Sequence, residues 1–117
     1  MMIFQEFRFE AAHWLPNVPP GHKCHGMHGH SYHVRVEVTG RVGQVTGWVI
    51  DYADIAHAWK PLLEQLDHHV LNELRGLENP TCEHLCRWIW ERMQFDGLGV
   101  VVEVRETPTA GARDDGL

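Results

Sequence analysis

Hydrophobic and polar residues alternate along two long segments in the first third of the chain. Over residues 2–12, Phe7, Phe9 and Ala11 alternate with polar or small side chains. Over residues 28–39, one row holds Tyr32, Val34, Val36 and Val38, and the other holds His33, Arg35, Glu37 and Thr39. A period of two residues is typical of a strand with one buried face. The pattern therefore predicts two strands of an antiparallel sheet that is covered on one side.

The same pattern of residues indicates two loop or turn regions and a further alternating segment. Residues 14–27 are rich in Pro, Gly and His, which favours a loop, and three glycines between residues 40 and 47 indicate a turn region. The short apolar run 48–50 is expected to form a strand. Residues 98–107 alternate around Val100, Val102 and Val104, which predicts a last strand. The polar residues after Thr107 are expected to be disordered toward the end.

Helical spacing appears in the middle of the chain. Ile55, Trp59, Leu62, Leu63 and Leu66 predict a helix over residues 52–66 that Asp51 caps. Pro61 within this segment predicts a kink or two short helices in series. A second helix is expected to begin near Thr81, a good N-cap, with an apolar stripe made of Cys82, Leu85, Cys86, Ile89 and Met93.

The order strand, strand, helix, helix, strand predicts an α+β fold, in which two helices pack on one face of an antiparallel sheet. At 117 residues the chain is expected to form a single domain, residues 1–117. Such a sheet leaves exposed strand edges, and association of several copies through those edges would cover them. A homo-oligomer is therefore expected.

The composition and net charge of the chain argue against several classes of protein. A net charge of −6 argues against nonspecific binding to nucleic acid or to anionic membranes, because both need basic surfaces. No stretch approaches the roughly 18 uninterrupted apolar residues of a membrane span. The first six residues lack the basic start and apolar run of a signal peptide. Three cysteines do not suggest a disulfide framework, so we expect a cytoplasmic protein with free thiols.

The most informative chemistry is a cluster of histidines near residue 28. His28 and His30 lie two apart on an extended segment, so they share a face, and Gly29 between them has no side chain. A hairpin-like pairing of the two strands could bring His13 alongside. Three imidazole nitrogens and one open position are typical of catalytic zinc. Cys24, four residues before His28, leaves an alternative open, because its sulfur could close the site as a fourth ligand.

Cys24 also has a chemical role if it stays outside the metal. A nearby cation lowers a thiol pKa and creates thiolate at neutral pH, and thiolate can accept a proton. Zinc polarises a hydroxyl or carbonyl oxygen of a substrate. Together these groups indicate proton abstraction beside an oxygen, followed by elimination, isomerisation or retro-aldol cleavage.

Further candidate residues lie elsewhere in the chain. Asp67 precedes His68 and His69 after the first helix, where a carboxylate could orient an imidazole; a solvated helix end is the alternative. Glu106 could accept N–H donors from a planar heterocycle or lie at the surface. The pair Cys82 and Cys86 could bind a metal, but packing in the core is the favoured interpretation.

Several short motifs together resemble the 6-pyruvoyltetrahydropterin synthase superfamily. They are similar above all to its bacterial branch, the 6-carboxy-5,6,7,8-tetrahydropterin synthases of queuosine biosynthesis. In chain order the motifs are FEAAH at Phe9–His13, GHKC at Gly21–Cys24, HGHS at His28–Ser31, LDHH at Leu66–His69, ENPT at Glu78–Thr81 and ET at Glu106–Thr107. They cover nearly the whole chain, and the short spacing from Cys24 to His28 resembles the bacterial branch. His25 is a departure, which we interpret as a solvated loop side chain.

The resemblance implies a tunnelling fold that assembles as two stacked trimers, a hexamer with sites at subunit boundaries. It implies zinc on His13, His28 and His30, with Cys24 as proton acceptor. It also implies that Asp67 and His68 relay protons and that Glu106 anchors the pterin ring or joins the relay. The implied reaction converts 7,8-dihydroneopterin triphosphate to 6-carboxy-5,6,7,8-tetrahydropterin and releases triphosphate and acetaldehyde.

Two alternatives remain open at this point. The first is the pyruvoyl-forming reaction on the same substrate, which eliminates triphosphate without expelling a two-carbon fragment. The second belongs to another class: a nonenzymatic zinc-binding module.

Overall fold

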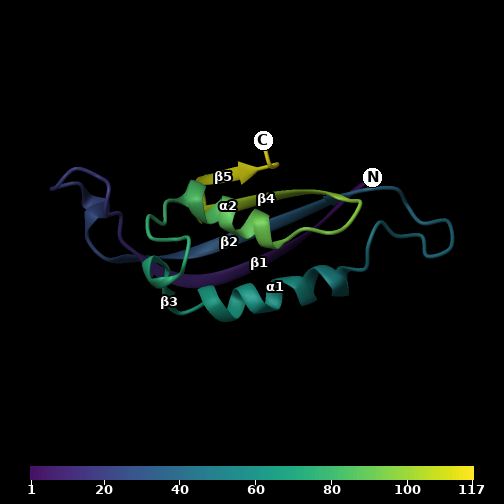
Figure 1. Cartoon of the computed structure of the whole chain (residues 1–117), viewed down its shortest axis with the longest axis horizontal. Helices are drawn as coiled ribbons and strands as arrows, with labels where there is room; N and C mark the ends of the chain where they lie inside the picture. The colour runs from purple at the N-terminus through teal and green to yellow at the C-terminus, as the bar shows by residue number, and fades with distance from the viewer.

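A computed structural model describes residues 1–117 and contains one five-stranded sheet with two helices on one face (Figure 1). The strands are β1 (Met2–His13), β2 (His28–Thr39), β3 (His69–Val70), β4 (Gly99–Thr107) and β5 (Ala110–Asp114). The helices are α1 (Tyr52–Leu66) and α2 (Cys82–Arg92), and two single turns are η1 (Lys23–His25) and η2 (Leu71–Glu73). The predicted α+β class, with two helices on one face of the sheet, is confirmed.

The sheet has the order β3-β1-β2-β4-β5, and every pairing except the short parallel contact of β3 with β1 is antiparallel. β1 and β2 pair along their whole length, from Met2 opposite Thr39 to His13 opposite His28. The expected hairpin-like pairing is therefore confirmed. The connecting segment 14–27 projects beyond the end of the sheet (Figure 1).

The core lies between the helices and the face of the sheet that carries the predicted valine row. Tyr32, Val34, Val36 and Val38 are all at most 1% exposed. α1 packs on β1, where Trp59 stacks on Phe7 with ring centroids 4.9 Å apart. α2 packs on β4 and β5, and its buried residues are Leu85, Cys86, Trp88 and Ile89. Burying this apolar surface is the main favourable term for the fold.

α1 begins where the sequence predicts. The carboxylate of Asp51 accepts a hydrogen bond from the backbone N–H of Ala53 at 2.9 Å, which satisfies a free donor of the first turn. The helix continues through Pro61 to Leu66 as one element. The alternative of two short helices in series is therefore wrong, because packing of Trp59 and Leu62 on the sheet holds both halves together.

Two local features differ from what the sequence pattern predicts. Residues 48–50 form bends instead of a strand, since no neighbouring strand pairs with them, and Val49 and Ile50 pack against the core from the loop. Residues 110–114 form β5, a strand that the sequence pattern does not predict. Their composition is poor for a strand, but β4 offers a free edge, and Arg87 of α2 donates to the Asp114 carboxylate at 3.0 Å.

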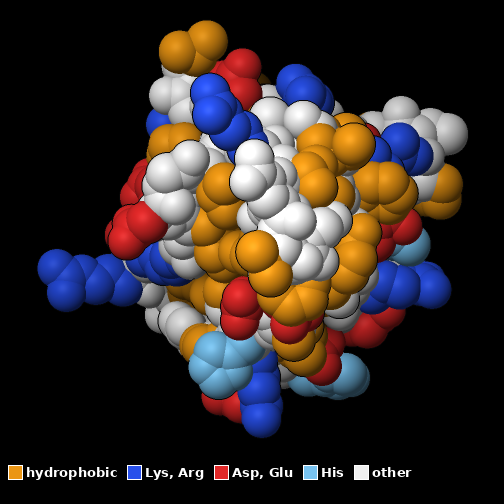
Figure 2. All heavy atoms as spheres, turned by 90° about the vertical axis from the view of Figure 1, so that its right-hand side faces the viewer, with side chains coloured by type: hydrophobic (Ala, Val, Ile, Leu, Met, Phe, Trp, Pro, Cys, Tyr) orange, Lys and Arg blue, Asp and Glu red, His pale blue; other side chains and the backbone are white.

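The end of the molecule that holds the N-terminus and the 40–51 loop exposes apolar side chains (Figure 2). Val45 is 98% exposed there, and Trp48 is 50% exposed. The molecule is elongated, with principal extents of 57 × 26 × 25 Å. No helix in the chain combines the length and the apolar character that crossing a bilayer requires.

Truncation at the interface of α2 with the sheet should weaken the fold. Ile89 is fully buried, so Ile89→Ala removes packing that the surroundings cannot restore, and we expect a loss of about 2–5 kcal/mol in the free energy of unfolding. Urea denaturation at a fixed protein concentration measures this. Val45→Ala is the control at a 98% exposed position and should change the free energy by less than about 0.5 kcal/mol. Equal effects of the two variants would contradict this account of the core.

Candidate functional site

Three histidines converge where β1 ends and β2 begins. His13 is the last residue of β1 and lies opposite His28, the first residue of β2, while His30 follows on the same face. Their potential ligand atoms all lie within 4.8 Å of one another. The rings stand nearly perpendicular, with interplanar angles of 67°, 86° and 88°. The edges of the rings, where the nitrogens lie, can therefore point to a common centre.

Hydrogen bonds on the far side of two rings decide which nitrogens are free. The carbonyl of Pro80, just before α2, lies 2.8 Å from Nδ1 of His13, and the carbonyl of Gly26 lies 2.8 Å from Nδ1 of His28. A carbonyl can only accept, so both Nδ1 atoms carry the hydrogen in the neutral rings. Each Nε2 atom then presents a lone pair toward the centre of the cluster.

The cluster fits a bound metal ion by its own chemistry. Nε2 of His13 and Nε2 of His28 lie 3.0 Å apart with lone pairs facing each other, an arrangement that a cation between them relieves. Nε2 of His30 is buried and has no hydrogen-bond partner. Burial lowers the pKa of His13 and of His30 below the usual histidine value, which favours the neutral form that binds metals. Far-side carbonyl partners are also typical of metal-binding histidines.

Glu106, near the end of β4, lies beside this cluster. Its Oε1 atom is 3.5 Å from Nε2 of His13 and 3.6 Å from Nε2 of His30. The side chain is 28% exposed. Its Oε1 atom faces the histidines, and the carboxylate can still accept a hydrogen bond from a ligand. The surface alternative for Glu106 is therefore unsupported.

Asp67 and His68 form a pair at the edge of the sheet beside β1. Oδ2 of Asp67 lies 2.9 Å from Nδ1 of His68, and the backbone N–H of Glu10 donates to Oδ1 of Asp67 at 2.9 Å. The hydrogen bond from the Glu10 N–H is the main cause that lowers the pKa of the Asp67 carboxyl, and the hydrogen bond with His68 lowers this pKa further. His69 instead turns its Nδ1 to the Asp67 carbonyl at 2.7 Å. The carboxylate thus orients His68, the residue that the resemblance selects.

A pocket of about 440 Å³ is lined by one member of each group, His30 and His68. It lies between β1, β2 and the residues around β3, and its lining includes His30, Ser31 and His68. The side chain of His68 is 79% exposed. The backbone of His68 has a positive φ of 57°, and its N–H donates to the Glu10 carbonyl, which holds this strained residue against β1.

Cys24 lies in η1 on the projecting segment and is only partly exposed. Its sulfur is not a member of the histidine cluster, which favours the open site over the closed four-ligand alternative. The Cys24 carbonyl accepts from the N–H of Leu15 at 2.9 Å, which ties the loop to the end of β1. His25 is exposed and also lies outside the cluster.

The two cysteines of α2 belong to the core. Sγ of Cys82 donates to the Val104 carbonyl at 3.4 Å, and Sγ of Cys86 donates to the Val102 carbonyl at 3.2 Å. Burial raises the pKa of Cys82 to about 11 and that of Cys86 to about 12. Both groups are thus thiols at neutral pH, in agreement with the packing interpretation.

Several supporting residues were not predicted from the sequence. Pro80 orients His13 through its carbonyl, Glu10 holds Asp67 through its N–H, and the Tyr32 hydroxyl lies 3.3 Å from Nδ1 of His13. The contacts of Pro80 and Glu10 use backbone atoms, which every residue type supplies, so the sequence does not indicate them. Tyr32 had one available signal, because it shares the face of His28 and His30.

The comparison with known proteins agrees with this geometry. A family model described as 6-pyruvoyl tetrahydropterin synthase matches residues 2–116. The chain belongs to this family. Among its relatives, a 6-carboxy-5,6,7,8-tetrahydropterin synthase of Synechocystis is 40% identical over 119 residues, which cover 96% of this chain and 91% of the relative.

Other members of the 6-pyruvoyl tetrahydropterin synthase family also match. A 6-pyruvoyl tetrahydrobiopterin synthase of Drosophila melanogaster is 31% identical over 96 residues, which cover 74% of this chain and 57% of that protein. The structure of the Caenorhabditis elegans 6-pyruvoyl tetrahydropterin synthase matches with a TM-score of 0.90 at 23% identity, over 100% of this chain and 96% of that chain. This likeness confirms the tunnelling fold.

Zinc binding should depend on the three histidines and not on the thiol. We expect wild-type protein to hold about one zinc ion per chain, His28→Ala to lose it and Cys24→Ala to keep it, because three nitrogens suffice for an open site. Elemental analysis after dialysis measures the zinc. His25→Ala is a matched control in the same segment and should keep the metal. Loss of zinc from Cys24→Ala would instead support the closed site, and circular dichroism would show whether each variant folds.

The three thiols should differ in reactivity. At pH 8 we expect one thiol per folded chain to react rapidly with a disulfide reagent, because Cys24 lies on a partly exposed loop whereas burial keeps Cys82 and Cys86 protonated. The absorbance of the released thiolate counts the reacting groups, and denatured protein should give three. The rapid phase should vanish in Cys24→Ser; three rapid thiols in the folded protein would contradict the assignment.

Proposed function

We propose that this protein converts 7,8-dihydroneopterin triphosphate and water to 6-carboxy-5,6,7,8-tetrahydropterin, with release of triphosphate and acetaldehyde. It would thus act as a zinc-dependent lyase in queuosine biosynthesis. The observation that carries the proposal is the 40% identity, over 96% of the chain, to a protein of that name. The convergence of three metal-competent nitrogens at one end of the sheet supports it.

In this proposal His13, His28 and His30 hold the zinc ion through the free nitrogens of their rings. Zinc bound there would polarise an oxygen of the substrate side chain and make the neighbouring C–H group more acidic. The far-side carbonyls of Pro80 and Gly26 keep two of the rings in the required orientation. Glu106 accepts N–H groups of the pterin ring, and its distances of 3.5 and 3.6 Å from two histidines support a position next to the reacting side chain.

Proton transfer is assigned to Cys24, Asp67 and His68. The Cys24 thiolate accepts a proton from the substrate and returns one to the ring. Asp67 orients His68 and stabilises its charged form, which makes the imidazole a second proton carrier. The 79% exposure of His68 leaves it free to meet a substrate or a neighbouring chain.

The proposal includes assembly into a hexamer of two stacked trimers. β3 covers only Ala11 and Ala12 of β1, so most of the β1 edge lacks a partner strand, and β5 forms the opposite edge. Unpaired edges of this length favour pairing with another copy. Cys24 on a projecting segment and an exposed His68 are also suited to a site between copies.

A second candidate is the pyruvoyl-forming reaction, and the Drosophila relative supports it. Both reactions use one substrate and one set of residues, so the residues alone do not separate them. They differ in the fate of the carbon side chain, because only the carboxy-forming reaction releases a two-carbon aldehyde.

Incubation of the zinc-loaded protein with 7,8-dihydroneopterin triphosphate tests both candidates. We expect acetaldehyde in amounts equal to the 6-carboxytetrahydropterin, measured by a coupled dehydrogenase assay and by mass spectrometry. Cys24→Ala, which removes the proton acceptor, should lower kcat by about 100-fold or more while zinc content stays unchanged. Val45→Ala, far out on an exposed loop, should keep full activity. Pyruvoyl product without acetaldehyde would favour the second candidate, and no turnover at all would favour a nonenzymatic zinc-binding module.

A further inference from the structure

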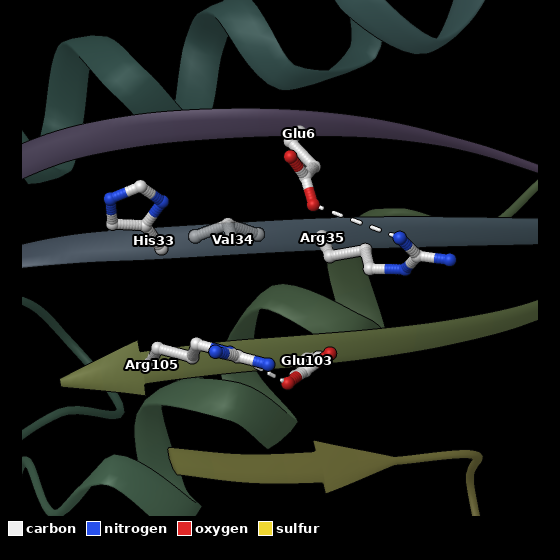
Figure 3. A pocket seen from close by; sticks show the side chains of 6 residues that line it. All are labelled: Glu6, His33, Val34, Arg35, Glu103 and Arg105. Atoms are coloured by element: carbon white, nitrogen blue, oxygen red, sulfur yellow. Dashed lines mark hydrogen bonds and ion pairs between the residues drawn. The ribbon is translucent and has the colours of Figure 1, made fainter. Parts of the chain in front are cut away.

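The open face of the sheet carries charged side chains in rows that run across the strands. Because the strands pair in register, Glu6 of β1 lies opposite Arg35 of β2, and Arg35 lies opposite Glu103 of β4. Arg113 of β5 continues the row opposite Glu103. Opposite charges alternate along this row, and an ion pair of 3.7 Å joins Arg35 to Glu6 (Figure 3). The four charges of this row sum to zero, so the row is self-neutralising in total charge.

The next row contains only basic side chains. Arg8 of β1 lies opposite His33 of β2, and His33 lies opposite Arg105 of β4. Side chains placed this way have Cβ atoms about 4.5–5.5 Å apart, and like charges at that distance destabilise a sheet. All three residues are exposed on the face away from the helices. Gly111 of β5, opposite Arg105, adds no side chain to the row.

Arg8 forms no ion pair with a carboxylate. Glu6 and Glu10 flank it on the same face of β1, but Glu6 pairs with Arg35, and Oε2 of Glu10 accepts a hydrogen bond from Ser31 at 2.6 Å. Figure 3 draws no hydrogen bond or ion pair from His33 to the five other residues that it shows. The row itself therefore holds two arginines and no carboxylate, in a chain whose net charge is −6.

Arg105 is held in place but retains free donors. Its Nε atom lies 3.0 Å from Oε1 of Glu103, and one terminal nitrogen donates to the Pro108 carbonyl at 3.3 Å. A guanidinium has five N–H donors, so several remain for a ligand. These contacts hold the guanidinium group over β4, beside Glu103 (Figure 3).

A pocket of about 290 Å³ lies over this row. Its lining consists of Arg8, Ser31, His33, Arg105 and Pro108, with no carboxylate. The row crosses three strands and so spans about 10 Å, two strand spacings. A chain of phosphates can contact side chains along the whole of that span, and guanidinium groups bind phosphate oxygens through paired hydrogen bonds.

We propose that the row of Arg8, His33 and Arg105 is a polyphosphate-binding site on the face of the sheet opposite the histidine cluster. Its ligand is either free triphosphate or the triphosphate group of an organic ester. Binding of free triphosphate is independent of the proposed function. Only the ester rests on the substrate proposed above.

Calorimetric titration of the full-length protein with inorganic triphosphate at low salt tests the site. We expect saturable binding that Arg8→Gln and Arg105→Gln each weaken by about tenfold or more, because each removes a charged hydrogen-bond donor. Arg113→Gln is the matched control: it removes the same charge from the same face, but from the self-neutralising row, and should change the affinity by less than about twofold. Circular dichroism confirms that the variants fold.

A second arm identifies the source of the phosphates. Dihydroneopterin triphosphate is added to His28→Ala protein, in which the proposed zinc site is removed, and its competition with inorganic triphosphate is measured. Competition that Arg8→Gln weakens assigns the row to the ester as well; no competition assigns it to free triphosphate alone. Absence of triphosphate binding, or equal effects of Arg8→Gln and Arg113→Gln, would overturn the proposal whatever the outcome of the acetaldehyde assay.

Discussion

The register between β1 and β2 is the constraint on which the rest of the structure depends. Twelve consecutive residues of each strand pair, and this fixes His13 opposite His28. A slip by one residue would turn His28 and His30 to the open face and the valine row to solvent. The same burial that forms the core thus brings three histidines together, and stability and site geometry cannot vary separately.

Segments next to the two helices also hold site residues in place. The segment before α2 places the Pro80 carbonyl against His13, and the end of α1 leads into Asp67, which the backbone of Glu10 holds. Backbone groups that belong to packed elements have little freedom to move. They are therefore suited to hold imidazole rings and a carboxylate in fixed orientations, which metal binding and proton transfer both require.

The two faces of the sheet carry different chemistry because successive residues of a strand point to opposite sides. On the covered face the strands end in histidines and in Glu106, next to a dry core. On the open face the same strands carry a self-neutralising row and a basic row, next to water. One set of strands can therefore support a metal centre and, as we propose, an anion site without interference between them.

Much of the fold and of the candidate site could be predicted from the sequence. Alternation in β1, β2 and β4 is strong because each has one buried face, and the motif around His28 indicates the cluster directly. β5 could not be predicted, since Ala110–Asp114 has little preference for a strand and forms one only because β4 offers its edge. The opposite holds at residues 48–50. This apolar run predicts a strand but forms bends, because no neighbouring strand is there to pair with it.

By itself the sequence determined which residues share a face, which positions can cap a helix and which side chains can bind a metal, because these follow from local periodicity and from functional-group chemistry. Only the tertiary structure decided which nitrogens of His13 and His28 are free, which histidine the Asp67 carboxylate orients, and that Arg8, His33 and Arg105 form one row. Those features depend on backbone carbonyls, N–H groups and strand register, and they come from segments far apart in the chain.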